Sequence, residues 1–166
     1  RFFGMNNSSI QTLWHFHPAY KLRYEDGSLK THHLTRGNVL IKPITPGENN
    51  WNVEVVRGQE EPYIQGWWSE EYNHKTPSSC VEFHNKAQKE NIFAWLIVPW
   101  KTKEPNVEIL DFSIANDDSN KVRVELSVNN KRFLCQYLVD YEKLKNPSDS
   151  TNYLEILEPN KSKSKS

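Results

Sequence analysis

Two histidines near the start of the sequence have the spacing of a metal-binding pair. His15 and His17 stand two residues apart in IQTLWHFH, a stretch typical of a β-strand. Side chains two apart on a strand project from the same face of the sheet. Neutral imidazoles placed in this way supply two ligands to a zinc ion, which needs at least one more. Spacing alone is weak evidence for a metal site, and the ordinary alternative is a core or solvated pair of histidines.

A second chemically rich stretch runs from Gly58 to Pro77 and reads GQEEPYIQGWWSEEYNHKTP. Prolines bound it, its glycines permit backbone conformations closed to other residues, and apolar residues alternate poorly along it, so we expect a long ordered crossing loop rather than a strand. Its aromatic rings either fill a gap between two sheets or stack on the apolar face of a sugar. For the second case the sugar-contacting residues are Trp67, Trp68, Tyr72 and His74.

No stretch carries a nucleophile elbow, a phosphate-binding loop or a paired-cysteine motif. Tyr72 and His74 are residue types that perform acid–base chemistry. The pattern fixes no geometry for them, so the catalytic residues stay unknown. Cys80 and Cys135 lie in strand-like runs and would pair only if the fold brought them together, so two free buried thiols are expected.

Composition limits the class of protein. The chain has 166 residues, enough to bury its own core, and we expect a single domain over residues 1–158 with a disordered, Lys- and Ser-rich tail at 159–166. The 21 basic and 21 acidic residues balance, which argues against a nucleic-acid partner. The longest apolar run, Ile92 to Trp100, is too short to cross a membrane, so no membrane partner is expected.

The elements that must position these residues are predicted to be strands. Aromatic and β-branched residues recur in short alternating runs without a convincing helix, which favours an all-β fold, an antiparallel β-sandwich of about ten to twelve strands. Asp26-Gly27 and Asn129-Asn130 are turn dipeptides typical of two-residue hairpins. Ile92 to Trp100 is almost continuously apolar and is expected to be the core strand, buried on both faces.

Three segments in this order resemble the C-terminal β-sandwich part of the heparinase II/III-like polysaccharide lyases. They are Thr12 to Pro18 (TLWHFHP), Val55 to Pro77, and Ile92 to Trp100. The similarity spans most of the chain, and its core is Gly58, Pro62, Gly66, Trp67, Trp68, Ser69, Tyr72 and Pro77. Members of this family join an N-terminal helical toroid to large β-sandwich sheets and bind substrate between the two parts.

The resemblance implies a lyase that cleaves uronic-acid-containing acidic polysaccharide, such as a glycosaminoglycan or alginate, by β-elimination. The chain, which opens without a methionine, would be the C-terminal fragment of a longer secreted or periplasmic enzyme. It would serve as scaffold and part of the cleft wall and be inactive alone, because the family's catalytic residues belong to the helical domain and to an earlier sandwich segment. The other reading is a stand-alone carbohydrate-binding module without catalysis.

The resemblance also implies one structural zinc. In family members a histidine near the end of the strand similar to TLWHFHP is a ligand, and by position this is His17, with His15 as the second choice. The remaining ligands would lie outside this chain, because they belong to earlier strands.

A third reading of the chain is purely structural, with exposed apolar strands packing against another chain or domain.

Overall fold

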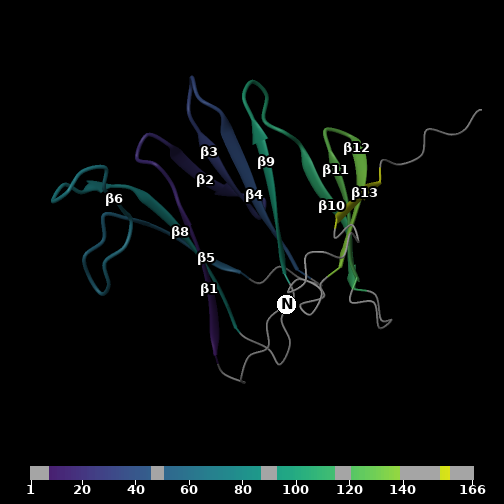
Figure 1. Cartoon of the computed structure of the whole chain (residues 1–166), viewed down its shortest axis with the longest axis horizontal. Helices are drawn as coiled ribbons and strands as arrows, with labels where there is room; N and C mark the ends of the chain where they lie inside the picture. Colours follow the sequence, from purple (N-terminus) through teal and green to yellow (C-terminus); the bar gives the residue numbers. More distant parts are fainter. Residues whose placement is uncertain (1–7, 46–50, 87–92, 115–120, 139–153, 158–166) are drawn as a thin grey trace, which may run out of the picture. The chain divides into compact units, whose positions relative to one another are not determined.

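The computed structural model describes residues 8–45, 51–86, 93–114, 121–138 and 154–157 (Figure 1). The tail predicted at 159–166 lies outside these residues. The described residues form thirteen strands and no helix, and every strand pair is antiparallel. The predicted all-β antiparallel class is therefore confirmed. No helix able to cross a membrane is found in the described part of the chain.

The strands group into two compact units, residues 1–103 (unit 1) and 104–166 (unit 2). The expectation of a single domain over residues 1–158 stays a prediction. Unit 1 contains β1 (Ser9–His15), β2 (Lys21–Glu25), β3 (Ser28–His32), β4 (Asn38–Ile44), β5 (Asn52–Arg57), β6 (Trp67–Trp68), β7 (Thr76–Pro77), β8 (Ser79–Lys86) and β9 (Ala94–Trp100). Unit 2 contains β10 (Val107–Ile114), β11 (Lys121–Val128), β12 (Lys131–Leu138) and β13 (Leu154–Leu157).

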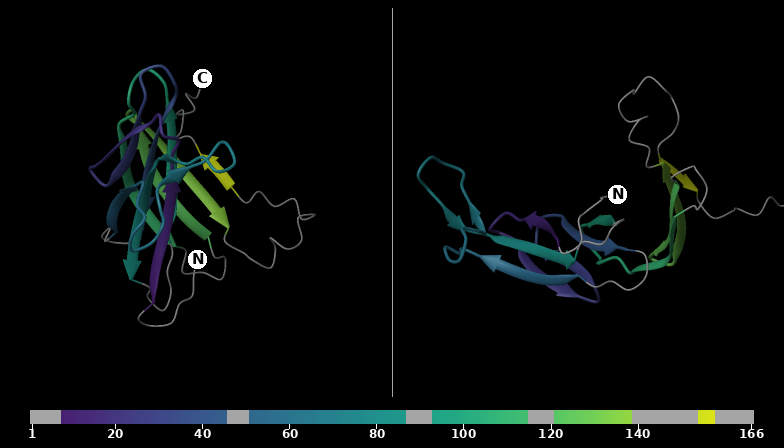
Figure 2. Two further views of the ribbon diagram at one scale, coloured as in Figure 1. Left: turned by 90° about the vertical axis from the view of Figure 1, so that its left-hand side faces the viewer. Right: turned by 90° about the horizontal axis from the view of Figure 1, so that it is seen from below.

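Unit 1 is a sandwich of two sheets that share one apolar core (Figures 1 and 2). The sheets have the strand orders β1-β8-β5 and β2-β3-β4-β9. Phe83 of β8 packs edge-on against Trp95 of β9, with ring centroids 4.9 Å apart. Its neighbours in the core include Leu29, Ile41, Trp51 and Val81, all buried. Each such side chain contributes about 1.5–3 kcal/mol relative to remaining exposed.

The two predicted hairpin turns are confirmed. Asp26 and Gly27 have φ of 50° and 66°, and Asn129 and Asn130 have 52° and 63°. Two successive residues with positive φ match the right-handed twist of the flanking strands. Local sequence therefore sets the pairing of β2 with β3 and of β11 with β12.

The expectation of a core strand at the run ending in Trp100 was wrong. The strand, β9, begins at Ala94, pairs with β4 and, among the described residues, lies at the edge of its sheet. Trp95 faces the core, but Ile97 is 51% exposed. A continuous apolar run indicates that both faces of a strand are apolar. It does not indicate whether other elements cover both faces.

Unit 2 is a four-stranded sheet in the order β10-β11-β12-β13. Val122, Val124 and Leu126 of β11 are buried, as their alternation predicts. A register shift between Ile109 and Asp111 marks a bulge in β10. Cys135 of unit 2 and Cys80 of unit 1 are both free thiols; Cys80 is buried as expected, whereas Cys135 is only half-buried.

Candidate functional site

The aromatic segment from Gly58 to Pro77 is an ordered excursion between β5 and β8. Its two ends meet at Gly66, whose carbonyl accepts hydrogen bonds from the amides of Gly58 and Ser78, both at 2.8 Å. Gly66 has a φ of +75°, and a Cβ there would lie 2.9 Å from backbone atoms of Val56, Arg57 and Ser78. Only glycine fits this close approach of three chain segments.

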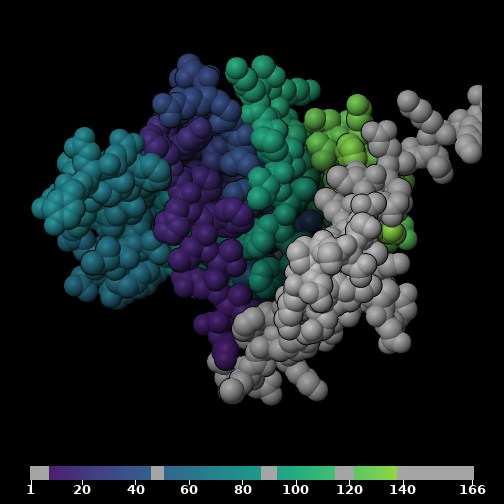
Figure 3. All heavy atoms as spheres, in the orientation of Figure 1, coloured from purple at the N-terminus to yellow at the C-terminus, as the bar shows by residue number. Residues whose placement is uncertain are grey.

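Gly66 divides the excursion into two loops. The first is closed by mutual backbone hydrogen bonds between Gln59 and Gln65, of 2.9 and 3.1 Å. The second connects β6 to β7, which pair with each other. In the space-filling view these residues, in teal, stand out beyond the N-terminal strand, in purple (Figure 3). The prediction of an ordered crossing loop is confirmed, and its order comes from backbone pairing at its base.

The two adjacent tryptophans have different surroundings. Trp67 donates from Nε1 to the carbonyl of Gln59 at 2.9 Å, and the Nζ of Lys75 lies 4.0 Å from its ring centroid. It therefore holds the two loops together. Trp68 is 37% exposed, and its ring centroid lies 5.1 Å from that of His17. Its Nε1 donates to Glu70 Oε1 at 3.2 Å.

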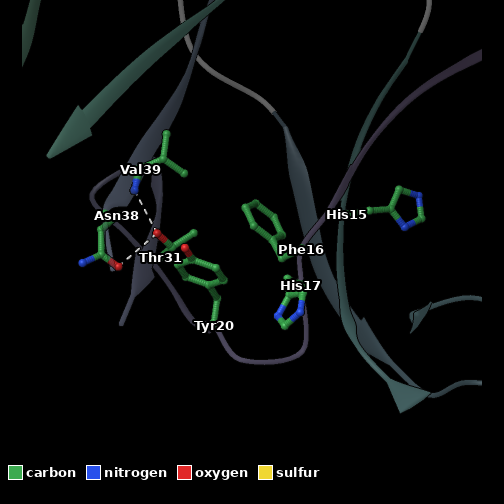
Figure 4. Close-up of a pocket in the computed structure, with 8 residues that line it drawn as sticks. His15, Phe16, His17, Tyr20, Thr31, Asn38 and Val39 are labelled. Carbon is green, nitrogen blue, oxygen red and sulfur yellow. Dashed lines mark hydrogen bonds between the residues drawn. The ribbon is translucent and has the colours of Figure 1, made fainter. Parts of the chain in front are cut away.

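His17 connects this aromatic surface to an open pocket of about 270 Å³ in unit 1 (Figure 4). The pocket is lined by His15, Phe16, His17, Tyr20, Thr31, Gly37, Asn38 and Val39. Thr31 Oγ1 accepts from the Val39 amide at 2.8 Å and donates to Asn38 Oδ1 at 3.3 Å. These hydrogen bonds fix one wall, and Phe16 and Tyr20 add aromatic rings to the lining (Figure 4).

The structure gives the two predicted zinc ligands different partners. β1 ends at His15, so the alternation that would place His17 on the same face stops there. His15 Nε2 lies 3.8 Å from the sulfur of Cys80, and its ring points away from Tyr20 and Thr31 (Figure 4). His17 accepts at Nδ1 from the Ala19 amide at 3.2 Å and turns Nε2 toward Glu70 Oε1 at 3.5 Å.

Among the described residues neither histidine belongs to a group of three metal-binding side chains. Zinc binding through His17 or His15 therefore stays a prediction. Of the predicted sugar-contacting residues, Trp68 lies beside His17, whereas Tyr72 lies in the second loop and is 95% exposed. His74, also exposed, donates its backbone amide to the carbonyl of Glu71 at 3.2 Å.

A lysine partly offsets the negative charge of the carboxylates in the segment from Gly58 to Pro77. Lys75 Nζ donates to Glu60 Oε1 at 2.7 Å, and this hydrogen bond and charge lower the pKa of Glu60 below its ordinary value. Sequence reasoning missed Tyr20, Thr31 and Asn38 as pocket residues. No motif marks them, because they are far apart in the sequence. They come together only when β3 pairs with β4 and the β1–β2 connection, which carries Tyr20, lies beside these strands.

Comparison with protein-family models, with curated proteins and with solved structures finds no match for this chain.

Proposed function

We propose that this chain is the β-sandwich part of a heparinase II/III-like lyase acting on uronic-acid-containing polysaccharide. It would contribute scaffold and one wall of the substrate cleft, with Trp68 and Tyr72 facing the sugar and His17 as one zinc ligand. The catalytic groups, the helical domain and the other zinc ligands would come from the rest of a secreted or periplasmic enzyme.

The observation that carries the proposal is the architecture of the crossing. Two residues that carry the family resemblance stabilise the crossing. Gly66 permits the contact of three chain segments, and Trp67 holds the two loops together. Trp68 is left partly exposed beside His17 and an open pocket lined by hydroxyl, amide and aromatic groups. Aromatic faces combined with a few polar groups are how proteins bind sugars.

Tryptophan fluorescence tests the binding half of the proposal. Oligosaccharides of heparin, heparan sulfate and alginate should quench the fluorescence of the chain, and neutral dextran should not. Trp68→Ala should abolish the quenching, because the stacking ring is gone. The matched control is Tyr24→Ala, which removes an aromatic ring of similar exposure on β2. Quenching that survives Trp68→Ala, or no quenching by any acidic oligosaccharide, would contradict the assignment.

A direct assay tests the division of labour. The chain alone should release no unsaturated uronate, measured by ultraviolet absorbance, from any of these polysaccharides. Elimination activity by the chain itself would show that its own residues carry the catalysis.

The second candidate, a stand-alone carbohydrate-binding module, uses the same exposed Trp68 and Tyr72. It predicts equal quenching by neutral and acidic sugars, which separates it from the lyase reading.

A further inference from the structure

The outer face of the β1-β8-β5 sheet carries a polar cluster that the proposed function does not use. Val81 and Phe83 of β8 point into the core, so Glu82 and His84 must alternate with them and face outward. Strand register places Glu54 of β5 directly opposite Glu82. It also places Gln11 of β1 opposite His84.

Glu82 is fully buried at the centre of this cluster, with 0% of its surface exposed. Its Oε2 atom has three neighbours: Tyr63 Oη donates at 2.8 Å, Gln11 Nε2 donates at 2.9 Å, and His84 Nε2 lies at 3.1 Å. Its Oε1 atom is buried without a hydrogen-bond partner among the described residues. A carboxylate oxygen in that situation loses its hydration without compensation.

Glu54 adds a second carboxylate to the same cluster. Like charges directly opposite each other on paired strands repel. His84 Nε2, 3.1 Å from Glu82 Oε2, balances one negative charge when its imidazole is protonated. A divalent cation bound by neutral His84 would balance both carboxylates. The cluster thus combines a buried carboxylate that has one unpartnered oxygen, a facing carboxylate that is exposed, and a half-buried imidazole. Buried charges of this kind occur where they are paired or coordinate a metal.

We propose that Glu54, Glu82 and His84 form a binding site for a divalent cation of the zinc type. One ligand atom from each residue lies within 4.8 Å of those of the other two. In a tetrahedral zinc site with ligands about 2.0–2.1 Å from the metal, two ligand atoms lie about 3.3 Å apart. The 3.1 Å between His84 Nε2 and Glu82 Oε2 fits two ligands of one ion. Imidazole and carboxylate donors suit zinc better than calcium or magnesium.

The site has an outer shell that links it to the crossing. Tyr63 lies in the first loop, and its hydroxyl donates a hydrogen bond to Glu82. The side-chain amide of Gln11, on β1, donates a second one. Hydrogen bonds to a ligating carboxylate orient it toward the metal. A bound ion therefore stabilises the first loop of the crossing against the sheet. The site is distinct from His15 and His17, because His15 contacts Cys80 and His17 contacts Trp68 and Glu70.

Calorimetric titration of the chelator-treated full chain with Zn²⁺ tests the proposal, with Co²⁺ as a spectroscopic probe. We expect one ion bound by these residues, a higher thermal midpoint with Zn²⁺, and a cobalt spectrum without a thiolate charge-transfer band. Glu54→Gln and His84→Gln should each weaken Zn²⁺ binding at least about tenfold, the loss that follows removal of even an outer-shell partner. Circular dichroism before titration checks that each variant is folded.

Three control variants make the result specific. Glu71→Gln and His74→Gln change the same residue types at exposed positions of the crossing and should leave binding unchanged. His17→Gln removes any binding that belongs to the separate predicted zinc ligand. The proposal is overturned if the chain binds neither Zn²⁺ nor Co²⁺, if Glu54→Gln and His84→Gln bind as tightly as the wild type, or if His17→Gln alone abolishes all binding.

Discussion

At the scale of the residue, Gly66 shows how a single missing side chain permits the candidate site. Its positive φ and its contacts with backbone atoms of Val56, Arg57 and Ser78 leave no room for a Cβ. The sequence indicated that a glycine here would adopt an unusual backbone conformation. It did not indicate that three segments would meet at this point, because that contact exists only after β5 and β8 have paired.

Replacing Gly66 by alanine should lower the free energy of unfolding by about 1–3 kcal/mol or more, because a left-handed conformation is combined with a backbone clash. Urea denaturation followed by tryptophan fluorescence measures the loss. Gly37→Ala is the matched control, since a Cβ there would meet only the Trp100 carbonyl, at 3.8 Å. Equal stability of the two variants would contradict the structural role of Gly66.

Cys80 illustrates what burial does to a reactive residue type. Desolvation, with a contribution from the charge of Glu82, raises the pKa of the Cys80 thiol to about 11. Its thiolate is therefore scarce at neutral pH, and it is a poor nucleophile in the folded protein. The alternating strand pattern predicted a buried thiol, but the nearby Glu82 became visible only with the structure.

The raised pKa gives stability a definite pH dependence. Between the ordinary thiol pKa and about 11 the folded chain holds a proton on Cys80 that the unfolded chain has lost. The free energy of unfolding should therefore fall as pH rises through this window. Cys80→Ala should show a shallower fall over the same range when urea midpoints are compared pH by pH. Parallel curves for the two proteins would contradict this assignment.

At the scale of the element, the crossing is held to the sandwich by a polar contact as well as by its backbone. Tyr63 donates its hydroxyl to buried Glu82, and this interaction raises the pKa of Tyr63. The sequence predicted an ordered crossing from its glycines, prolines and aromatic rings. It could not predict which ring would reach which strand, because Tyr63 and Glu82 lie 19 residues apart.

Tyr63→Phe should lower the urea midpoint of the chain, because the buried Glu82 Oε2 loses one of its hydrogen-bond donors. The loss should be measured by urea denaturation with chelator present, so that metal binding does not contribute. Tyr72→Phe removes a hydroxyl that is exposed in the second loop and should change stability by no more than about 0.5 kcal/mol. A Tyr63→Phe variant as stable as Tyr72→Phe would show that the contact contributes nothing.

At the scale of the whole molecule, the chain divides into two compact units. The buried core cluster of Leu29, Ile41, Trp51, Val81 and Phe83 lies entirely in unit 1, as do the partly buried residues packed against it. All six tryptophans also precede residue 104, so tryptophan fluorescence reports on unit 1 alone. A core complete within one unit is what allows a domain to fold by itself.

Residues 1–103 expressed alone should therefore keep a β-type circular dichroism spectrum and a cooperative urea transition in tryptophan fluorescence. The matched comparison is the full chain, followed by the same signal. A gradual, non-cooperative loss of fluorescence from the shorter chain would mean that unit 1 depends on residues beyond 103. That outcome would favour the single domain expected from the sequence.

The sequence by itself determined the features that depend on neighbours along the chain. Alternation of apolar residues determined the all-β class and the inward face of β11, and the turn dipeptides determined two hairpins, because backbone dihedral preferences are local. Tertiary structure decided which strands became edges, as for β9, since coverage depends on partners distant in sequence. It also decided the chemistry of the sheet face: Glu54, Glu82 and His84 are ordinary strand residues in the sequence. They form a cluster only because the register of β5 with β8 sets two carboxylates side by side, and because Tyr63 folds over one of them.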